Sequence, residues 1–341
     1  MTVRPAGAAN AQEAEAILDV RGLTTEFRLQ DSTVVANADV SLRVPKGATQ
    51  GIVGESGSGK SVLCRSILRL IPSPPAFITA GEIWFENRDL LSLDQTEMAR
   101  VRGTRIRMVF QNPMTSLNPV WPIGDQITEG LRVHYGLSRR AAREQGIELL
   151  HRVGIASPKQ RYHDYPFQWS GGMLQRAVIA MAMAGEPALL LADEPTTALD
   201  VTIQDQILAL LLELQGRTGM SLVLVSHDMA VVAETCDSVA VMYAGRIMEV
   251  APTKELFETP LHPYTLGLLS SIPNFAGGES RLVPIRGQPP SLANRSAGCP
   301  FAERCRVATP DCATTAVALR PVAKGRLSAC LYPERLGGTE R

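Results

Sequence analysis

Short apolar segments alternate with amphipathic helical segments along most of this chain. The predicted strands are residues 17–20, 40–44, 50–54, 82–85, 107–110, 188–192 and 222–225. The last two are wholly apolar over four or five residues, which is typical of strands that are buried on both faces. Such strands, alternating with helices, predict an α/β fold built around a parallel sheet.

Three helices stand out from the same pattern. The first covers residues 60–70, follows a loop rich in glycine and serine, and ends before Pro72. Ser138 is placed to cap the second helix, which has one apolar face and which Gly154 can end. The third has a leucine-rich apolar face and is expected to close at Gly216.

The changes in pattern along the chain predict three parts. Residues 1–16 are polar and alanine-rich, which predicts a disordered tail. Residues 17–255 form the main domain, and its middle, about 88–185, is mainly helical. From about Pro252 onward proline and glycine become frequent and periodicity fades, so residues 256–341 are expected to form a separate extension.

Composition excludes several classes of protein. The 341 residues include 34 basic and 34 acidic side chains and are 45% hydrophobic, as in an ordinary globular protein. A formal net charge of zero argues against a protein that coats nucleic acid electrostatically. No run of 18 apolar residues and no signal-peptide pattern is present, so we expect a cytosolic protein whose contact with a membrane is through partners.

The loop after the third predicted strand carries the pattern of a phosphate-binding loop. Residues 54–61 read Gly-Glu-Ser-Gly-Ser-Gly-Lys-Ser and match G-x-x-x-x-G-K-[ST]. Glycines let backbone N–H groups point at phosphates, and the following helix adds its positive end. Lys60 would reach the β- and γ-phosphates, and the Ser61 hydroxyl would ligate Mg²⁺. The alternative, a plain glycine-rich turn, does not require this strand–loop–helix context.

Two acidic residues follow a buried strand. Asp193 and Glu194 come directly after the apolar run 188–192, at the carboxyl end where open α/β sheets place ligand groups. Asp193 suits a water-mediated contact with Mg²⁺, and Glu194 could polarise an attacking water. A helix-capping acidic pair is the alternative, which the phosphate loop upstream makes less attractive.

A second anion site is predicted about 20 residues before the acidic pair. Ser170 is a good N-cap, and Gly171 and Gly172 leave backbone donors uncovered at the positive end of a helix. The phosphate loop already serves one nucleotide, so a second site suggests that each nucleotide is shared between two subunits.

The order of these motifs over roughly residues 17–250 resembles that of the ATP-binding cassette (ABC) ATPases. The matching segments are the Walker A loop 54–61, Gln111 at a strand end, the Ser170-Gly171-Gly172 signature, Asp193 and Glu194 of Walker B, Ala198-Leu199-Asp200 as the D-loop, and His227. The signature departs from the commonest LSGGQ at two positions, with Trp169 for leucine and Met173 for glutamine.

This resemblance implies a P-loop NTPase cassette with a parallel core sheet, an antiparallel β subdomain and a helical signature subdomain, followed by a small irregular extension. It also implies a head-to-tail dimer with two ATPs between one subunit's Walker A and the other's signature. The implied ATP-binding residues are Phe27, Gly54, Ser56, Gly57, Ser58, Gly59, Lys60, Ser61, Ser170, Gly171, Gly172 and Asp200.

The same resemblance implies that catalysis depends on three further side chains. Glu194 acts with His227, which steadies the γ-phosphate, and Gln111 senses Mg²⁺ and couples to the permease. Phe27 falls where the family stacks adenine. Taken alone, His227 would more often be a core or surface histidine, and Phe27 a core residue.

The extension resembles that of the ATPases of oligopeptide and dipeptide importers and of their nickel- and glutathione-importing relatives. The matching segments are 110–119 around Gln111, His262-Pro263-Tyr264-Thr265, 285–290 and Gly298-Cys299-Pro300-Phe301. The resemblance therefore extends through nearly the whole chain. It does not separate the substrates of these importers.

Four cysteines crowd into the last 43 residues, Cys299, Cys305, Cys312 and Cys330, with spacing C-x5-C-x6-C-x17-C. Without an export signal, such a cluster predicts metal binding before disulfides. Zinc sites usually begin with a tighter pair, which favours an iron–sulfur cluster; some members of this branch carry [4Fe–4S] there. Zinc and free thiols remain the alternatives.

Together these features predict the ATP-hydrolysing subunit of an ABC importer for peptides or a similar small polar solute. The resemblance implies a related but distinct ATPase as dimer partner, with a homodimer as the alternative. It also implies two transmembrane permeases, an extracytoplasmic solute-binding protein and a peripheral place on the cytoplasmic face of the inner membrane. The alternative is a soluble ABC ATPase acting on ribosomes or DNA. One cassette, the lack of heptads and the charge balance argue against it.

Overall fold

The computed structural model describes residues 15–197, 199–272, 284–293 and 297–338. The chain divides into two compact units: unit 1 comprises Met1–Leu91 and Ser226–Arg341, and unit 2 comprises Ser92–Val225. Nearly all of the predicted tail 1–16, and Ala198 of the predicted D-loop, lie outside the described residues.

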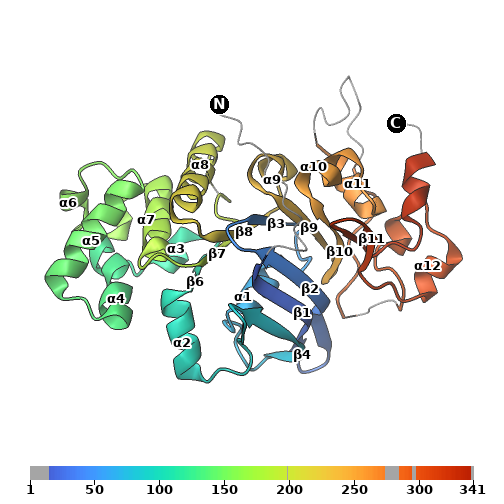
Figure 1. The fold of residues 1–341 in the computed structure, drawn as a ribbon, viewed down its shortest axis with the longest axis horizontal. Coiled ribbons are helices and arrows are strands. Elements are labelled where there is room, and N and C mark those ends of the chain that lie inside the picture. Colours follow the sequence, from blue (N-terminus) through green and yellow to red (C-terminus); the bar gives the residue numbers. More distant parts are fainter. Residues whose placement is uncertain (1–14, 198, 273–283, 294–296, 339–341) are drawn as a thin grey trace. The chain divides into compact units, whose positions relative to one another are not determined.

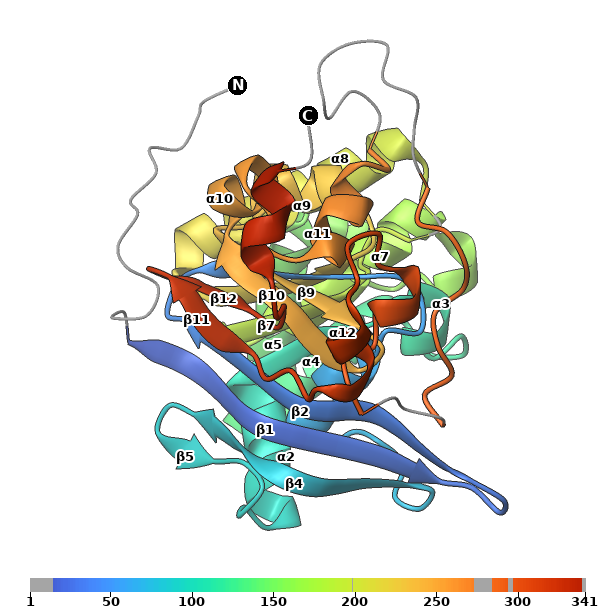
Figure 2. The same cartoon turned by 90° about the vertical axis from the view of Figure 1, so that its right-hand side faces the viewer.

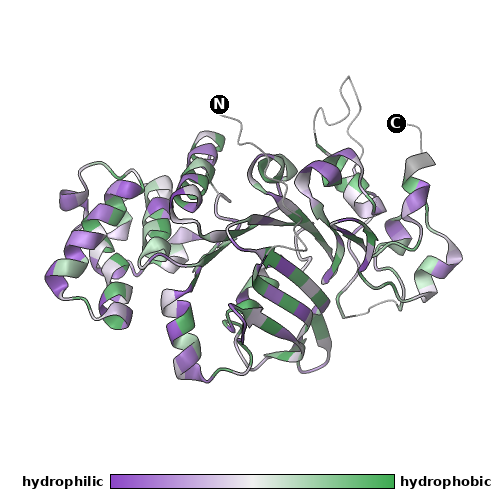
Figure 3. Ribbon diagram, in the orientation of Figure 1, coloured by the Kyte–Doolittle hydropathy of each residue, from purple (hydrophilic) through white to green (hydrophobic). Residues whose placement is uncertain are grey.

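Unit 1 contains an antiparallel sheet in the order β2-β1-β4-β5 (Figure 1). Its strands are β1 Ala16–Arg28, β2 Thr33–Pro45, β4 Ala76–Phe85 and β5 Arg88–Asp89. Buried and more exposed positions alternate along much of β1 and β2, and Figure 3 shows the corresponding green and purple bands. This alternation gives the sheet one face for the core of the unit and one for solvent.

A second group of strands in unit 1 runs in the order β11-β12-β10-β9-β3. These strands are β3 Thr49–Val53, β9 Ser238–Tyr243, β10 Arg246–Pro252, β11 Arg320–Ala323 and β12 Arg326–Ser328. β3 and β9 are parallel, whereas the later strands add antiparallel pairs, with β12 beside β10 (Figure 2). The helices of unit 1 are α1 Lys60–Ile67, α9 Met229–Thr235, α10 Thr253–Glu258, α11 Pro263–Leu269 and α12 Pro310–Thr314, with 3₁₀ turns at Ala302–Arg304 and Pro333–Gly338.

Unit 2 combines a parallel sheet with helices. Its strands pair in the order β8-β7-β6 and are β6 Ile106–Val109, β7 Leu189–Asp193 and β8 Ser221–Ser226, the last residue of which begins the second segment of unit 1. The helices are α2 Gln95–Thr104, α3 Pro113–Ser116, α4 Ile123–Tyr135, α5 Arg139–Arg152, α6 Pro158–Arg161, α7 Gly171–Met183 and α8 Val201–Thr218, with a 3₁₀ turn at Pro166–Gln168. Helices α4, α5 and α7 pack on one another (Figure 1). Parallel strands with helices between them confirm the predicted α/β class.

The predicted helix boundaries are confirmed to within a few residues. Ser138 caps α5 by accepting a hydrogen bond from the backbone N–H of Ala141 at 3.2 Å. The helix that was expected to close at Gly216 continues to Thr218, because the left-handed residue is Gly219, at φ 69°. The Gly219 N–H donates to the Gln215 carbonyl, which is the usual way to end a helix, whereas Gly216 is tolerated inside it.

The extension is tied to β10 by hydrogen bonds. The Ala329 N–H donates to the Met248 carbonyl, next to the β10–β12 pairs. Arg326 forms an ion pair with the fully buried Glu249, whose Oε1 also accepts the Leu261 N–H at 2.8 Å. Burial raises the pKa of Glu249, and the bonds from Leu261 and Arg326 act against that shift. The structure therefore groups residues 256–338 with the rest of unit 1, and the domain boundary near 255 stays a prediction.

Within the described residues, each helix is either too short or too polar to traverse a bilayer.

His262 is predicted to make unit 1 sensitive to acid. Its Nδ1 accepts the Tyr264 N–H at 3.1 Å to cap α11, and burial lowers its pKa to about 3 from 6.5. The unfolded chain binds this proton near pH 6.5 and the folded chain does not, so stability falls as pH drops below 6.5. Going from pH 7.5 to 5.0 should cost about 2 kcal/mol at this residue.

The test compares urea unfolding of the wild type and His262→Asn at both pH values. Asparagine can also cap a helix but does not titrate, so its loss of stability on acidification should be smaller by about the same 2 kcal/mol. An equal loss in both proteins would contradict the prediction.

Candidate functional site

The phosphate loop, residues 54–59, connects β3 to α1 in unit 1. Gly54 has φ +152°, and a Cβ built there would lie 2.0 Å from the Met242 carbonyl oxygen. Gly59 has φ +101°, and its Cβ would lie 2.5 Å from the Ala36 carbonyl oxygen. Both positions therefore require glycine, because neighbouring backbone from β9 and β2 approaches the loop closely.

Lys60 folds back into the loop. Its Nζ donates to the Gly54 carbonyl at 2.7 Å and to the Glu55 carbonyl at 2.9 Å, and the residue is 5% exposed. Ser61 follows in the first turn of α1. Ser56 and Gly57 are exposed and Ser58 is buried. The loop thus combines a buried cation with a helix N-terminus, an arrangement that suits the phosphates of a nucleotide.

The acidic pair ends β7 in unit 2. Asp193 is the last residue of the strand and is 1% exposed, while Glu194 follows with φ +47°. A glutamate in the left-handed region costs about 1–3 kcal/mol and is retained where the surrounding structure fixes it. Its N–H donates to the Val225 carbonyl at 3.1 Å, which anchors the backbone beside β8. The neighbouring strand therefore holds Glu194, a half-buried residue, in this strained conformation.

The Glu194 carboxylate is oriented by two donors. Gln111 Nε2 and Thr197 Oγ1 each donate to Glu194 Oε2 at 2.9 Å. The structure thus brings together two of the three side chains for which sequence predicts a catalytic role. Sequence reasoning missed Thr197, although a hydroxyl three residues after an acidic residue in a turn is a usual local partner.

The signature begins α7. Ser170 is the N-cap and accepts the Met173 N–H at 3.4 Å, as expected. A Cβ at Gly172 would lie 2.9 Å from Ile203 Cγ2 of α8, so this glycine is also required by packing. Gly171 is exposed, and a Cβ there would make only an ordinary contact, 3.6 Å from Leu199 Cδ2. Backbone donors at this helix end are accessible to an anion.

Trp169, the unusual signature residue, is a buried anchor. It is 6% exposed, and its Nε1 donates to Asp164 Oδ2 at 3.0 Å. Arg161 Nη1 donates to the same oxygen at 3.0 Å. The indole therefore occupies an interior position with its polar atom satisfied, immediately before the Ser170 cap.

For the remaining predicted nucleotide residues, the structure shows their positions in the fold but does not test their roles. Asp200 caps α8 by accepting the Ile203 N–H at 3.0 Å. His227 follows β8 and is exposed, and Phe27 is half-buried on β1, where it pairs with Val34 and Ala76. Their roles stay predictions.

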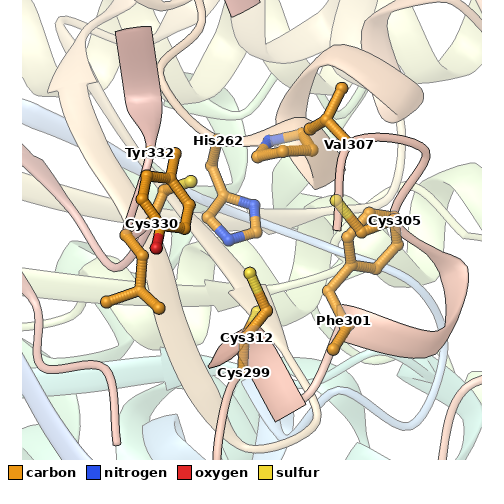
Figure 4. Close-up of a pocket in the computed structure, with 11 residues that line it drawn as sticks. His262, Cys299, Phe301, Cys305, Val307, Cys312, Cys330 and Tyr332 are labelled. Carbon is orange, nitrogen blue, oxygen red and sulfur yellow. The ribbon is translucent and has the colours of Figure 1, made fainter. Parts of the chain in front are cut away.

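The predicted metal centre at the tail cysteines is wrong. Cys299, Cys305, Cys312 and Cys330 do line one pocket, together with His262 (Figure 4). Yet among the described residues, which include all four thiols, no group of three or more cysteine, histidine or acidic side chains could hold a metal ion. Neither an iron–sulfur cluster nor zinc fits these residues.

The surroundings of the four thiols are mainly apolar. Burial raises the pKa of Cys299 and of Cys330 to about 11, so both are neutral thiols near pH 7. The rings of Phe301 and Tyr332 also line the pocket, which leaves the thiols as small apolar packing groups.

Two family models match the chain. ABC transporter matches residues 38–197, and the Oligopeptide/dipeptide transporter, C-terminal region matches residues 248–312. The first includes the phosphate loop, the signature and the acidic pair, and the second includes the His262–Thr265 segment and three of the four tail cysteines.

Known proteins resemble the chain over most of their length. The Bacillus subtilis dipeptide transport ATP-binding protein DppD is 50% identical over 291 residues, which are 85% of this chain and 87% of that protein. The oligopeptide transport ATP-binding protein OppD of the same organism is 50% identical over 289 residues, or 84% of this chain and 81% of that protein.

Among solved structures, a dimeric ATP-binding cassette in a post-hydrolysis state with ADP and Pi matches with a TM-score of 0.63 and 28% identity. The match covers 69% of this chain and 98% of that one. These likenesses agree with the motif order, the parallel sheet and the helical signature segment described above. The chain belongs to the ABC transporter ATP-binding proteins of the oligopeptide/dipeptide type, and it is an ATPase of that family.

Proposed function

We propose that the chain hydrolyses ATP to energise the uptake of di- or oligopeptides through partner permeases. The observation that carries this proposal is the presence, in one chain, of the loop and acidic residues of an ATPase and a C-terminal region of the oligopeptide/dipeptide transporter type. The named relatives are dipeptide and oligopeptide transport proteins, which supports peptides as the cargo.

Phosphate binding and activation of the attacking water are each assigned to residues already described. Lys60 and the loop amides hold the β- and γ-phosphates, and Glu194, fixed by Gln111 and Thr197, polarises the attacking water. His227 steadies the γ-phosphate and Phe27 stacks on adenine; both roles rest on family resemblance.

The family resemblance assigns Mg²⁺ to Ser61 of unit 1 and to Gln111 and Asp193 of unit 2. Ser61, Gln111 and Asp193 offer the oxygen ligands that Mg²⁺ prefers, and Asp193 is a buried carboxylate at a strand end. When bound, Mg²⁺ would neutralise charge on the β- and γ-phosphates.

The signature is proposed to act on a nucleotide held by another subunit. Ser170, Gly171 and Gly172 present the positive end of α7, which suits the γ-phosphate in trans. The dimeric cassette with ADP and Pi supports such an arrangement. The partner is proposed to be a related but distinct ATPase, with Asp200 at the shared interface.

Four exposed apolar side chains of unit 2 support docking to permeases. Met114, Val120 and Trp121, which follow Gln111, are 61%, 72% and 47% exposed, and Phe167 is 72% exposed. Apolar side chains at such exposure suit a protein contact. We place the subunit at the cytoplasmic face of the membrane, with two permeases and an extracytoplasmic binding protein completing the importer.

A soluble ABC ATPase that acts on ribosomes or DNA is the rival function. The match of residues 248–312 to an oligopeptide/dipeptide transporter C-terminal region argues for import instead.

Glu194→Gln should lower ATP turnover about 10²-fold or more, because the amide cannot act as a base. Thr197→Val should lower turnover by a smaller factor, because it removes one of the two donors that orient Glu194. Steady-state phosphate release is the measurement. Near wild-type release from Glu194→Gln would refute its role.

Gly171→Ala should reduce turnover at least about tenfold, because a methyl group would cover an exposed helix end that receives phosphate. Its melting temperature should not fall, since the new Cβ meets nothing closer than 3.6 Å. Gly216→Ala, exposed within α8, is the matched control and should keep wild-type turnover. Unchanged turnover in Gly171→Ala would remove the signature from the mechanism.

Tagged chain, purified from membranes in mild detergent, should carry permeases and a second ATP-binding cassette protein. Mass spectrometry of the co-purified proteins makes the identification, and a mock purification from untagged cells is the control. Ribosomal or DNA-repair proteins without any permease would overturn the transport function while leaving the ATPase intact.

A further inference from the structure

The carboxylate of Glu55, the second residue of the phosphate loop, is held by an arginine from the extension. Arg304 Nη1 donates to Glu55 Oε2 at 2.8 Å, and Arg304 Nη2 donates to Glu55 Oε1 at 3.0 Å. The Arg304 side chain is 7% exposed and that of Glu55 is 24% exposed. This is a two-pronged arginine–carboxylate pair, which combines charge with a fixed geometry.

The guanidinium is fixed from its other sides as well. Nε donates to the Arg286 carbonyl at 2.8 Å, Nη1 to Tyr243 Oη at 3.1 Å and Nη2 to the Gly287 carbonyl at 3.3 Å. The group also lies near the ring faces of Tyr243 and Phe301, 5.7 and 5.9 Å from their centroids. Each of its three nitrogens is engaged, so Arg304 holds Glu55 in one position.

The backbone of Glu55 is held by the same extension. Its N–H donates to Tyr264 Oη at 2.8 Å, and Tyr264 is fully buried against Tyr243 and Phe301. The Glu55 carbonyl accepts from Lys60 Nζ at 2.9 Å. Contacts therefore run from the extension through Glu55 to the lysine that is proposed to bind phosphate.

A carboxylate in a phosphate-binding loop opposes nucleotide binding electrostatically. Its negative charge repels a polyanionic nucleotide unless a cation neutralises it. Arg304 supplies that cation from 249 positions away in the sequence. Without Arg304, Glu55 would keep its charge and lose the bonds that position it.

We propose that Arg304 is a positioning residue of the nucleotide site, which neutralises Glu55 and holds the phosphate loop in its binding conformation, so that the extension sets nucleotide affinity. The segment from Cys299 to Cys305, on which Arg304 lies, thereby acts on the loop rather than only on folding. This inference rests on the proposed role of the loop and Lys60 in binding the phosphates.

The test measures ADP binding by calorimetry, and KM and kcat for ATP, on the full chain. Arg304→Ala should raise the Kd for ADP and the KM for ATP by about tenfold or more while kcat changes less than threefold. Arg306→Ala, which changes an exposed arginine two residues after Arg304, is the control and should match the wild type. Wild-type Kd and KM in Arg304→Ala would overturn the proposal.

A double variant tests whether Arg304→Ala weakens nucleotide binding through the charge of Glu55 or through destabilisation of the extension. Adding Glu55→Gln to Arg304→Ala removes the unneutralised carboxylate and should recover at least threefold of the lost affinity. A merely destabilised extension would not respond in this way, so absence of recovery would overturn the electrostatic part of the proposal. Arg304→Lys, which keeps the charge without the fork, should fall between the wild type and Arg304→Ala.

Lys60→Ala distinguishes this proposal from the assigned role of the loop. If Lys60→Ala abolishes ADP binding while Arg304→Ala does not weaken it, only the role of Arg304 fails. If Lys60→Ala binds ADP normally, the nucleotide role of the loop itself fails, and with it the proposed function.

Discussion

A loop that binds phosphate through its own backbone must expose its amides and yet keep a single conformation. Here the first requirement is met by glycines, and the second by neighbours that come very close. The Met242 carbonyl faces Gly54, and the Ala36 carbonyl faces Gly59, at distances that exclude any side chain. The Gly245 N–H donates to the Ser58 carbonyl at 2.9 Å. Backbone from β2, from β9 and from the turn after β9 thus surrounds the loop closely.

Ion pairs from the extension also help to hold the loop and the neighbouring strand β10 in a single conformation. Arg304 pairs with Glu55 of the loop, and Arg326 pairs with Glu249 of β10, so two arginines beyond residue 256 each engage a glutamate before it. Buried ion pairs are stabilising only when their remaining donors and acceptors are satisfied. Arg304 has such partners in two backbone carbonyls and the Tyr243 hydroxyl. Arg326 bonds to Thr259, but its Nε and Glu249 Oε2 are buried without a hydrogen bond. These ion pairs therefore join the extension to the phosphate loop and to β10 within unit 1.

Local features of the fold and site could be predicted from the sequence because their causes are local. Glycine spacing predicts the loop, an apolar run predicts β7, and Ser138 and Ser170 are caps because their side chains reach their own helices. Pairs that join distant segments have no such signal. The Arg304–Glu55 pair depends on chain positions 249 apart. The left-handed backbone of Glu194 likewise has no sequence pattern that predicts it.

The spacing of the four tail cysteines correctly predicts that they lie close together, but it wrongly predicts that they bind a metal. Four thiols within a short irregular segment do meet in one pocket, as the pattern indicates. What spacing does not convey is the surroundings: Phe301 packs on Tyr243 and Tyr264 with centroids 5.4 and 5.3 Å apart, and burial keeps Cys299 and Cys330 protonated. Neutral thiols beside aromatic rings act as packing groups. Phe301, three residues before Arg304, packs on Tyr264, whose hydroxyl accepts the Glu55 N–H, so packed rings rather than a metal join this turn to the phosphate loop.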